Sequence, residues 1–201
     1  MEEIFARIYA QHGWGSLETP SGSGSTISNT GAIRAELPFV VREFGIQSVL
    51  DIPCGDFHWM KEIALDEYIG ADIVGTLVDA NVRKYGTPTT RFCRLDITQD
   101  ELPEVDLVFC RDCLVHFSFD DISRALHIIK KSKSCYLMTT TFTSVEMNQE
   151  IQTGDWRPLN LQKAPLNFPE PIRLMKENRI WDGSEWSDKS LGLWRIEDLP
   201  D

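Results

Sequence analysis

The stretch between residues 48 and 142 alternates short apolar runs, typical of strands, with segments whose apolar residues recur at helical spacing. Helices of about 10 to 15 residues between such strands indicate βαβ units, because a parallel strand is reached only by a crossover. The sequence therefore predicts a Rossmann-like, doubly wound α/β fold with a mainly parallel sheet. Five strands are expected here, at residues 48–52, 68–74, 90–97, 105–110 and 134–142.

Four helices are expected around these strands. The one after the fourth strand begins at Ser118, because Asp121 three residues later completes a capping-box arrangement. Asp56 is the expected cap of a helix after the first strand, and Gly86 ends a helix after the second. In a helix before the first strand, Pro38 either makes a kink or begins a second part.

The chain after Phe142 loses this alternation. Residues 153–171 hold four prolines, which exclude a long helix, and five large apolar side chains, which argue against a disordered tether. We interpret them as an ordered loop packed over the sheet. Residues 171–177 and 190–199 have the pattern of two further strands joined by a polar turn at 182–188, which predicts a β-hairpin that closes a seven-stranded sheet.

Length and charge limit the classes of protein that fit. A chain of 201 residues suits one hydrophobic core, so we expect a single domain. Its net charge of -11 would repel a polyanion, and no nucleic-acid partner is expected. No apolar stretch approaches a membrane span and the N-terminus lacks the features of a signal peptide, which predicts a cytoplasmic protein without a membrane partner. The five cysteines are expected to be reduced thiols.

Acidic residues end three successive predicted strands, at Asp51, Asp72 and Asp96. In open α/β sheets, ligands bind at the carboxyl ends of the strands, near the point where strand order reverses. A carboxylate about 20 residues beyond the first strand and turn can accept two hydrogen bonds from a ribose diol. Each acid alone fits a helix cap or a turn equally well, but three in succession favour a nucleoside site.

The turn after the first strand, "DIPCGDF", indicates which nucleoside. A dinucleotide site uses G-x-G-x-x-G so that backbone amides approach a pyrophosphate. Here Pro53 has no N–H to donate, Asp56 adds negative charge, and Gly55 alone permits close approach. The turn therefore disfavours a pyrophosphate and favours an adenosine that carries a cationic group.

These residues resemble the class I S-adenosylmethionine-dependent methyltransferases. In that family the first strand and turn read roughly acid-x-G-x-G-x-G, an acid ends the second strand, and another follows the third. "LDIPCGDF", "GADIV" and "CRLDIT" match in order and spacing, and "DLVFCRDCLVHF" resembles the fourth-strand motif under the methionine moiety. Pro53 and Phe57 replace the first and third motif glycines. The "LDIPCGDF" form is also similar to a small bacterial branch of uncharacterised methyltransferases that carry "SGSGS" and "GDWRPLNL".

The resemblance implies that S-adenosylmethionine is the cofactor. Asp51 would orient the turn, and Gly55 would let the backbone approach the methionyl part. Asp72 would hold the ribose hydroxyls, and Asp96 would lie near adenine. The resemblance extends the cofactor site to the neighbouring residues Pro53, Cys54, Ile73 and Ile97 and, through their backbone near the sulfonium, to Cys110 and Arg111.

The Ser- and Gly-rich segment at residues 19–31 has two interpretations. Composition alone is typical of a flexible linker. Under the resemblance, we prefer an ordered loop that closes over the cofactor. Arg34, just after this segment, is then a candidate partner for the carboxylate of the cofactor.

Candidate catalytic residues follow the fourth strand. Methyl transfer from a sulfonium depends on positioning and exclusion of water, and it needs a general base only when the acceptor must lose a proton. His116 is the first candidate because imidazole titrates near neutral pH, and Asp112 is the second. The alternative for His116 is a structural histidine bonded to backbone. Trp156 and Arg157 are candidates for the acceptor pocket, with local core packing as the alternative for Trp156.

The "CRDC" sequence at Cys110 to Cys113 raises the question of a metal or redox site. The sequence contains no second C-x-x-C and no H-x₃-H to complete a zinc tetrad, and Cys110 ends an apolar strand. We therefore predict no metal. No sequence feature indicates an oligomeric state.

The predicted function is methyl transfer to a small-molecule or glycan-type acceptor. Residues 1–46 would form an N-terminal lid and helices, 47–142 the cofactor-binding core, and 143–201 the loop and closing hairpin. Two alternatives stay open: a non-catalytic subunit that binds S-adenosylmethionine, and an NAD-dependent oxidoreductase. Asp72 fits the oxidoreductase, whereas the missing glycines and Asp96 count against it.

Overall fold

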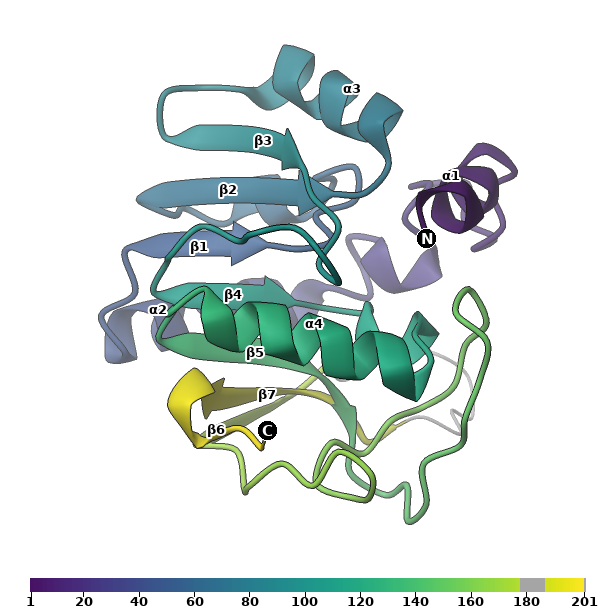
Figure 1. The fold of residues 1–201 in the computed structure, drawn as a ribbon. Coiled ribbons are helices and arrows are strands. Elements are labelled where there is room, and N and C mark those ends of the chain that lie inside the picture. Colours follow the sequence, from purple (N-terminus) through teal and green to yellow (C-terminus); the bar gives the residue numbers. More distant parts are fainter. Residues whose placement is uncertain (178–186, 201) are drawn as a thin grey trace.

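A seven-stranded sheet forms the centre of the molecule (Figure 1). The computed structural model describes residues 1–177 and 187–200. The strand order is β3-β2-β1-β4-β5-β7-β6, with β7 antiparallel to β5 and β6 and the other neighbours parallel. The order reverses between β1 and β4, which places a ligand site at their carboxyl ends. The strands are β1 (Ser48–Asp51), β2 (Glu67–Asp72), β3 (Thr90–Arg94), β4 (Leu107–Cys110), β5 (Tyr136–Phe142), β6 (Arg173–Lys176) and β7 (Lys189–Arg195).

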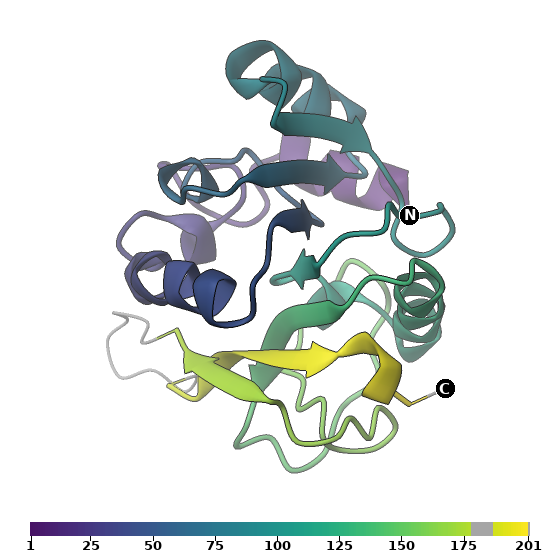
Figure 2. The same ribbon diagram turned by 90° about the vertical axis from the view of Figure 1, so that its left-hand side faces the viewer.

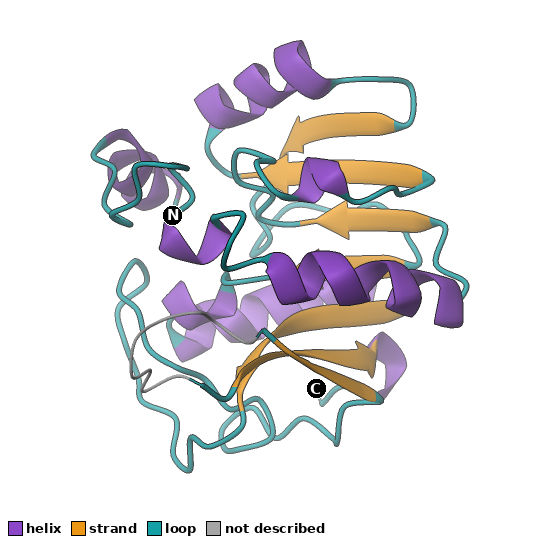
Figure 3. Cartoon of the chain, turned by 180° about the vertical axis from the view of Figure 1, so that it is seen from behind, coloured by secondary structure: helices purple, strands orange, loops and turns teal. Residues whose placement is uncertain are grey.

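Helices cover both faces of the sheet, as Figure 2 shows with α2 (Gly31–Glu43) on one side and α4 (Phe119–Lys131) on the other. α3 (Gly75–Tyr85) packs against β2 and β3. α1 (Glu2–Ala10) lies beyond the carboxyl ends of the parallel strands (Figures 1 and 3). Short 3₁₀ helices occur at Ser23–Ser25, Met60–Glu62, Leu114–His116 and Ile196–Asp198.

Two hydrophobic cores result from the alternation of side chains along each strand. Val49 belongs to the core under α2, and the next residue, Leu50, belongs to the core under α4. Because both faces are buried, β4 is apolar along its whole length, and β1 is apolar at Val49 and Leu50. The predicted fold class, including the hairpin of β6 and β7, is confirmed.

The helix predicted at Ser118 is confirmed, although the Ser118 backbone N–H donates to the Thr153 hydroxyl and not to Asp121. The Ser118 hydroxyl accepts a hydrogen bond from the Asp121 backbone N–H at 3.2 Å. α3 ends at Tyr85, immediately before Gly86, as predicted. α2 runs continuously through Pro38, so that residue neither ends nor restarts the helix. The inward face of α4 is buried and includes Ile122, Ala125, Leu126 and Ile129.

The helix predicted after β1, with Asp56 as its cap, is wrong. The Asp56 carboxylate instead accepts hydrogen bonds from the hydroxyls of Thr19 and Ser21, at 2.9 and 2.8 Å. Phe57 has a φ of 57°, which a regular helix cannot contain. A turn followed by the 3₁₀ helix at Met60–Glu62 therefore occupies this region.

The proline-rich segment forms no helix or strand and buries Leu159, Leu161, Leu166 and Phe168, as predicted for an ordered loop. Most of the turn predicted at 182–188 lies outside the described residues. Among the described helices, none combines the length and the apolar character needed to cross a bilayer.

Candidate functional site

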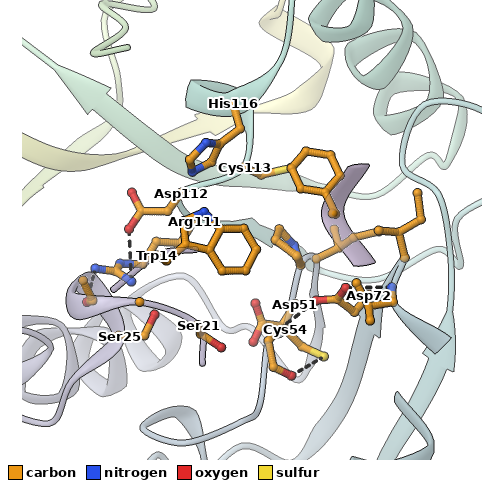
Figure 4. A pocket seen from close by; sticks show the side chains of 18 of the residues that line it. Trp14, Ser21, Ser25, Asp51, Cys54, Asp72, Arg111, Asp112, Cys113 and His116 are labelled. Carbon is orange, nitrogen blue, oxygen red and sulfur yellow. Dashed lines mark hydrogen bonds and ion pairs between the residues drawn. The ribbon is translucent and has the colours of Figure 1, made fainter. Parts of the chain in front are cut away.

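A cavity of about 280 Å³ lies where the strand order reverses (Figure 4). Its walls come from residues that follow β1, β2, β3 and β4, from the N-terminal segment, and from the start of β7. Segments far apart in the sequence thus meet at one edge of the sheet. Nearly all the predicted cofactor contacts line it: Asp51, Pro53, Cys54, Gly55, Asp72, Ile73, Asp96, Ile97 and Arg111.

Two buried carboxylates form the floor of this cavity. Asp51 accepts a hydrogen bond from the Tyr68 hydroxyl at 2.7 Å, and burial raises the pKa of Asp51 to about 7. Asp72 accepts hydrogen bonds from the backbone N–H groups of Gly55 and Val74, at 3.2 and 3.0 Å. Burial raises the pKa of Asp72 to about 6, and these N–H groups oppose the increase.

Asp72 thus connects the ends of β1 and β2, and it lines the cavity as an acceptor that a diol can reach. Asp96, two residues beyond β3, accepts hydrogen bonds from the backbone N–H and hydroxyl of Thr98, at 3.0 and 2.6 Å. These bonds fix the Asp96 side chain at the cavity wall. The structure therefore brings together all three strand-end acids.

The turn after β1 needs glycine at position 55. Gly55 has a φ of +54°, and a Cβ added there would lie 2.4 Å from the Ser21 hydroxyl oxygen. The Gly55 carbonyl accepts a hydrogen bond from the Asn81 side chain at 2.7 Å, a contact that links α3 to the turn and that sequence reasoning missed. Gly55 thus lets the Ser21 segment pack directly on the turn.

Replacing Gly55 with alanine should lower the free energy of unfolding by about 1–2 kcal/mol, since an L-residue is strained at positive φ. It should also displace Ser21 from Asp56. Urea denaturation measures the change. Gly75→Ala is the control, because its Cβ would meet only Arg94 Cδ at 3.6 Å; equal effects at both positions would contradict the strain argument.

The Gly-rich segment packs against the cavity. Residues 21–25 line it, and a 3₁₀ helix spans Ser23–Ser25. One end is held by the Ser21 hydroxyl, which donates to Asp56 at 2.8 Å. Near the other end, the Gly24 carbonyl accepts from Arg111 Nη2 at 2.8 Å. These contacts favour an ordered loop over the linker interpretation.

Three predicted site residues are absent from the described residues that line the cavity: Arg34, Cys110 and Arg157. Arg34 pairs with Glu62 at 2.5 Å and donates to the Ile27 carbonyl. Cys110 is fully buried in β4.

Arg157 has a structural role. Its guanidinium donates to the carbonyls of Leu114, Phe117 and Gln149, at 2.9, 2.6 and 3.1 Å, and so braces the segment after β4. Burial lowers the pKa of Arg157 to about 10. Its neighbour Trp156 lines the cavity as predicted.

His116 ends the 3₁₀ helix after β4 and faces the cavity (Figure 4). Its Nδ1 lies 2.8 Å from the Asp155 carbonyl oxygen. Because a carbonyl only accepts hydrogen bonds, this contact assigns the proton to Nδ1 and leaves the lone pair on Nε2. Burial lowers the pKa of His116 below its usual 6.5, so the ring is neutral at pH 7. The backbone bond and a catalytic role are thus compatible.

Asp112 also lines the cavity, but it is bound to cations. Lys189 Nζ lies 2.6 Å from its carboxylate, and Arg111 Nη1 lies at 3.3 Å. The buried Arg111 side chain donates to Glu177 at 2.7 Å, and the role of its backbone near the sulfonium stays a prediction. A carboxylate stabilised by two cations is a poor proton acceptor, so Asp112 is the weaker candidate for a general base.

Sequence reasoning missed Lys189, Glu177 and the aromatic wall of Phe5, Tyr9, Trp14 and Phe142. One sequence feature could have indicated Lys189: it is a charged residue immediately before the apolar run "SLGLW". Among the residues that the structure describes, no group of three or more His, Cys, Asp or Glu side chains is placed to hold a metal ion.

Comparison with known proteins shows what this fold resembles. No family model matches the chain, and no curated protein matches it. Among solved structures, human N-acetylserotonin methyltransferase in complex with S-adenosylmethionine superposes with a TM-score of 0.64 at 15% identity, over 96% of this chain and 59% of that one.

Two further structures match over nearly their whole length. Magnesium protoporphyrin IX methyltransferase from Synechocystis, with bound S-adenosylhomocysteine, has a TM-score of 0.58 at 14% identity, over 96% of this chain and 93% of that one. A TehB-like S-adenosylmethionine-dependent methyltransferase from Corynebacterium glutamicum has a TM-score of 0.56 at 17% identity, over 95% and 97%.

The chain spans about half the length of several other structures that it matches. Sequence identities this low establish a shared fold and do not establish a shared activity. The sheet order, the hairpin of β6 and β7 and the three superpositions agree. The chain therefore has the fold of the class I S-adenosylmethionine-dependent methyltransferases.

Proposed function

We propose that this protein transfers a methyl group from S-adenosylmethionine to a small-molecule or glycan-type acceptor. One observation carries the proposal: a single cavity at the strand-order reversal holds the acids Asp72 and Asp96 and a neutral histidine, His116. The acids suit an adenosine, and the histidine suits an acceptor that loses a proton.

The residues present fit the cofactor. Asp72 would accept hydrogen bonds from the ribose hydroxyls, because its carboxylate lines the cavity at the end of β2. Ile73 and Ile97 would contact the adenine, and Asp96 would accept from its amino group. The Gly-rich segment over the turn at Gly55 would cover the methionyl part and exclude water.

S-adenosylmethionine supplies a methyl group on a sulfonium: the acceptor lone pair forms the new bond to carbon, and the C–S electron pair returns to sulfur. His116 Nε2 would take the proton that an oxygen or nitrogen acceptor loses. The bond from Nδ1 to Asp155 keeps Nε2 in the basic form and orients the ring. Trp14 and Trp156 would close the acceptor side.

The two alternatives are less well supported. An NAD-dependent oxidoreductase needs a turn that donates N–H groups to a pyrophosphate, whereas this turn holds Pro53 and Asp56. A non-catalytic subunit gives no reason for a cavity-facing histidine with a free-base tautomer.

The "LDIPCGDF", "SGSGS" and "GDWRPLNL" sequences further support a place in the bacterial branch of methyltransferases named in the sequence analysis. We infer a single domain in which residues 1–46 form the lid.

Calorimetric titration tests the cofactor. S-adenosylmethionine and S-adenosylhomocysteine should bind in the micromolar range, and NAD should not. Asp72→Asn should weaken both by about 10- to 100-fold, because a charge-assisted acceptor is lost. Since burial raises the pKa of Asp72 to about 6 and the ionised form is the better acceptor, affinity should rise with pH between about pH 5 and pH 7 and then level.

Asp79→Asn, on the exposed face of α3, is the matched control and should leave both affinities unchanged. Asp51 also titrates in this range, because burial raises its pKa to about 7. The pH dependence of affinity in Asp51→Asn therefore shows how much of it comes from Asp72 alone. Binding of NAD, or of none of the three ligands, would overturn the proposed function. Unchanged affinity in Asp72→Asn would remove Asp72 as the ribose ligand.

A further inference from the structure

A cluster of four charged side chains lies beside the acceptor end of the cavity. Arg111, Glu177 and Lys189 are at most 6% exposed, whereas the fourth member, Asp112, is 29% exposed at its side chain. Lys189 Nζ contacts Glu177 at 3.1 Å and Asp112 at 2.6 Å. The free energy needed to remove these charges from water exceeds the free energy that the ion pairs regain. Stability alone therefore does not explain the cluster.

Asp112 is the member of this cluster that reaches the cavity most directly. Its φ of 53° is rare for a residue other than glycine and directs the side chain off the end of β4. The Asp112 backbone N–H donates to the Thr140 hydroxyl at 2.8 Å, which holds this conformation. Lys189 and Arg111 then keep the carboxylate in one orientation.

Figure 4 shows the Asp112 carboxylate and the His116 ring facing the same part of the cavity. Both present hydrogen-bond acceptors. The tautomer of His116 leaves a lone pair on Nε2. The Asp112 carboxylate accepts from Lys189 at both oxygens and from the Thr140 hydroxyl, and its exposed part, 29% of the side chain, faces the cavity. A ligand between them is matched only if it offers two donors.

Aromatic rings enclose the same region. The Trp14 ring lies 6.2 Å from the His116 ring, and the Trp156 ring lies 6.0 Å from that of Phe142. All four side chains line the cavity. Aromatic walls favour a ligand with a flat or apolar ring face, held in orientation by a small number of polar groups.

We propose that the acceptor carries two neighbouring hydrogen-bond donors on a ring, one methylated at His116 and the other bound by Asp112. The inference rests on the proposed function and makes its acceptor more specific. Asp112 is then a binding residue that sets specificity, and the buried cations hold its charge in place. A sugar with a vicinal diol or amino alcohol and an aromatic catechol share this chemistry.

Paired probes test the proposal in the wild-type protein. Catechol against phenol represents the aromatic source, and trans-1,2-cyclohexanediol against cyclohexanol represents the saturated ring of a sugar. Binding is measured by calorimetry with S-adenosylhomocysteine bound, and methyl transfer by release of S-adenosylhomocysteine. In at least one pair, the two-donor member should be preferred by about 10- to 100-fold, the effect of one hydrogen bond to a charged group.

The variant Asp112→Asn should reduce that preference to less than about threefold, because the amide replaces a charged acceptor, while cofactor affinity is unchanged. Asp120→Asn, exposed in the first turn of α4, is the matched control and should keep the preference.

Equal use of both members of each pair, or no binding of any two-donor probe while S-adenosylhomocysteine binds, overturns this inference and leaves the proposed function standing. Failure to bind S-adenosylhomocysteine itself overturns the proposed function first. Should Asp112→Asn fail to fold, as thermal melting would reveal, the wild-type comparison of paired probes decides alone.

Discussion

Replacing His116 with glutamine is expected to lower kcat by about 10²- to 10⁴-fold, the usual contribution of a positioned general base. Glutamine has a similar reach and can still donate to the Asp155 carbonyl, so the loop at residues 153–157 should stay in place. Affinity for S-adenosylmethionine should not change, because Asp72, the proposed ribose ligand, lies across the cavity from His116 (Figure 4). Steady-state kinetics and calorimetry together separate these effects.

The pH profile gives the same prediction a second readout. A general base acts in its deprotonated form, and burial lowers the pKa of His116 below 6.5. The rate in the wild-type protein should therefore rise with pH below that value and be level at neutral pH, and His116→Gln should lose this limb. His127→Gln, on the exposed face of α4, is the control. An unaltered rate in His116→Gln would exclude His116 from the mechanism.

The sequence predicted those parts of the fold that local patterns determine. α4 was predictable because its cap, its period and its buried face all agree. The segment after β1 has the same kind of periodicity, yet it does not form a helix. There the Asp56 side chain is bound by Thr19 and Ser21, 35 or more residues earlier, and such long-range contacts override local propensity.

The site residues also divide into those that local sequence patterns predict and those that depend on long-range contacts. The strand-end acids were predictable, because parallel strands bring their carboxyl ends together whatever the loops do. The surroundings of Arg34 were not predictable, because its position after the Gly-rich segment says nothing of Glu62, with which it pairs. Lys189 reaches the site through the antiparallel pairing of β5 with β7, and no local pattern specifies which residue in that register meets Asp112.

The buried cluster leads to the largest expected effect on stability. Arg111→Met should lower the free energy of unfolding by about 3–5 kcal/mol, because it removes one of the cations that compensate Glu177, which is 1% exposed. The same change releases the Gly24 carbonyl, which accepts from Arg111 at 2.8 Å, so cofactor affinity should fall as well. Urea denaturation and calorimetry measure the two losses.

A double-mutant cycle decides whether compensation of charge is the cause. Combining Arg111→Met with Glu177→Gln removes both members of one pair, so the double variant should be more stable than the sum of the two single losses implies, by about 1–3 kcal/mol. Lys189 would then retain Asp112 as its partner at 2.6 Å, and the start of β7 should stay in register. Additive losses would show that Arg111 stabilises the fold through packing on Trp59, 5.6 Å from its ring centre, rather than through Glu177.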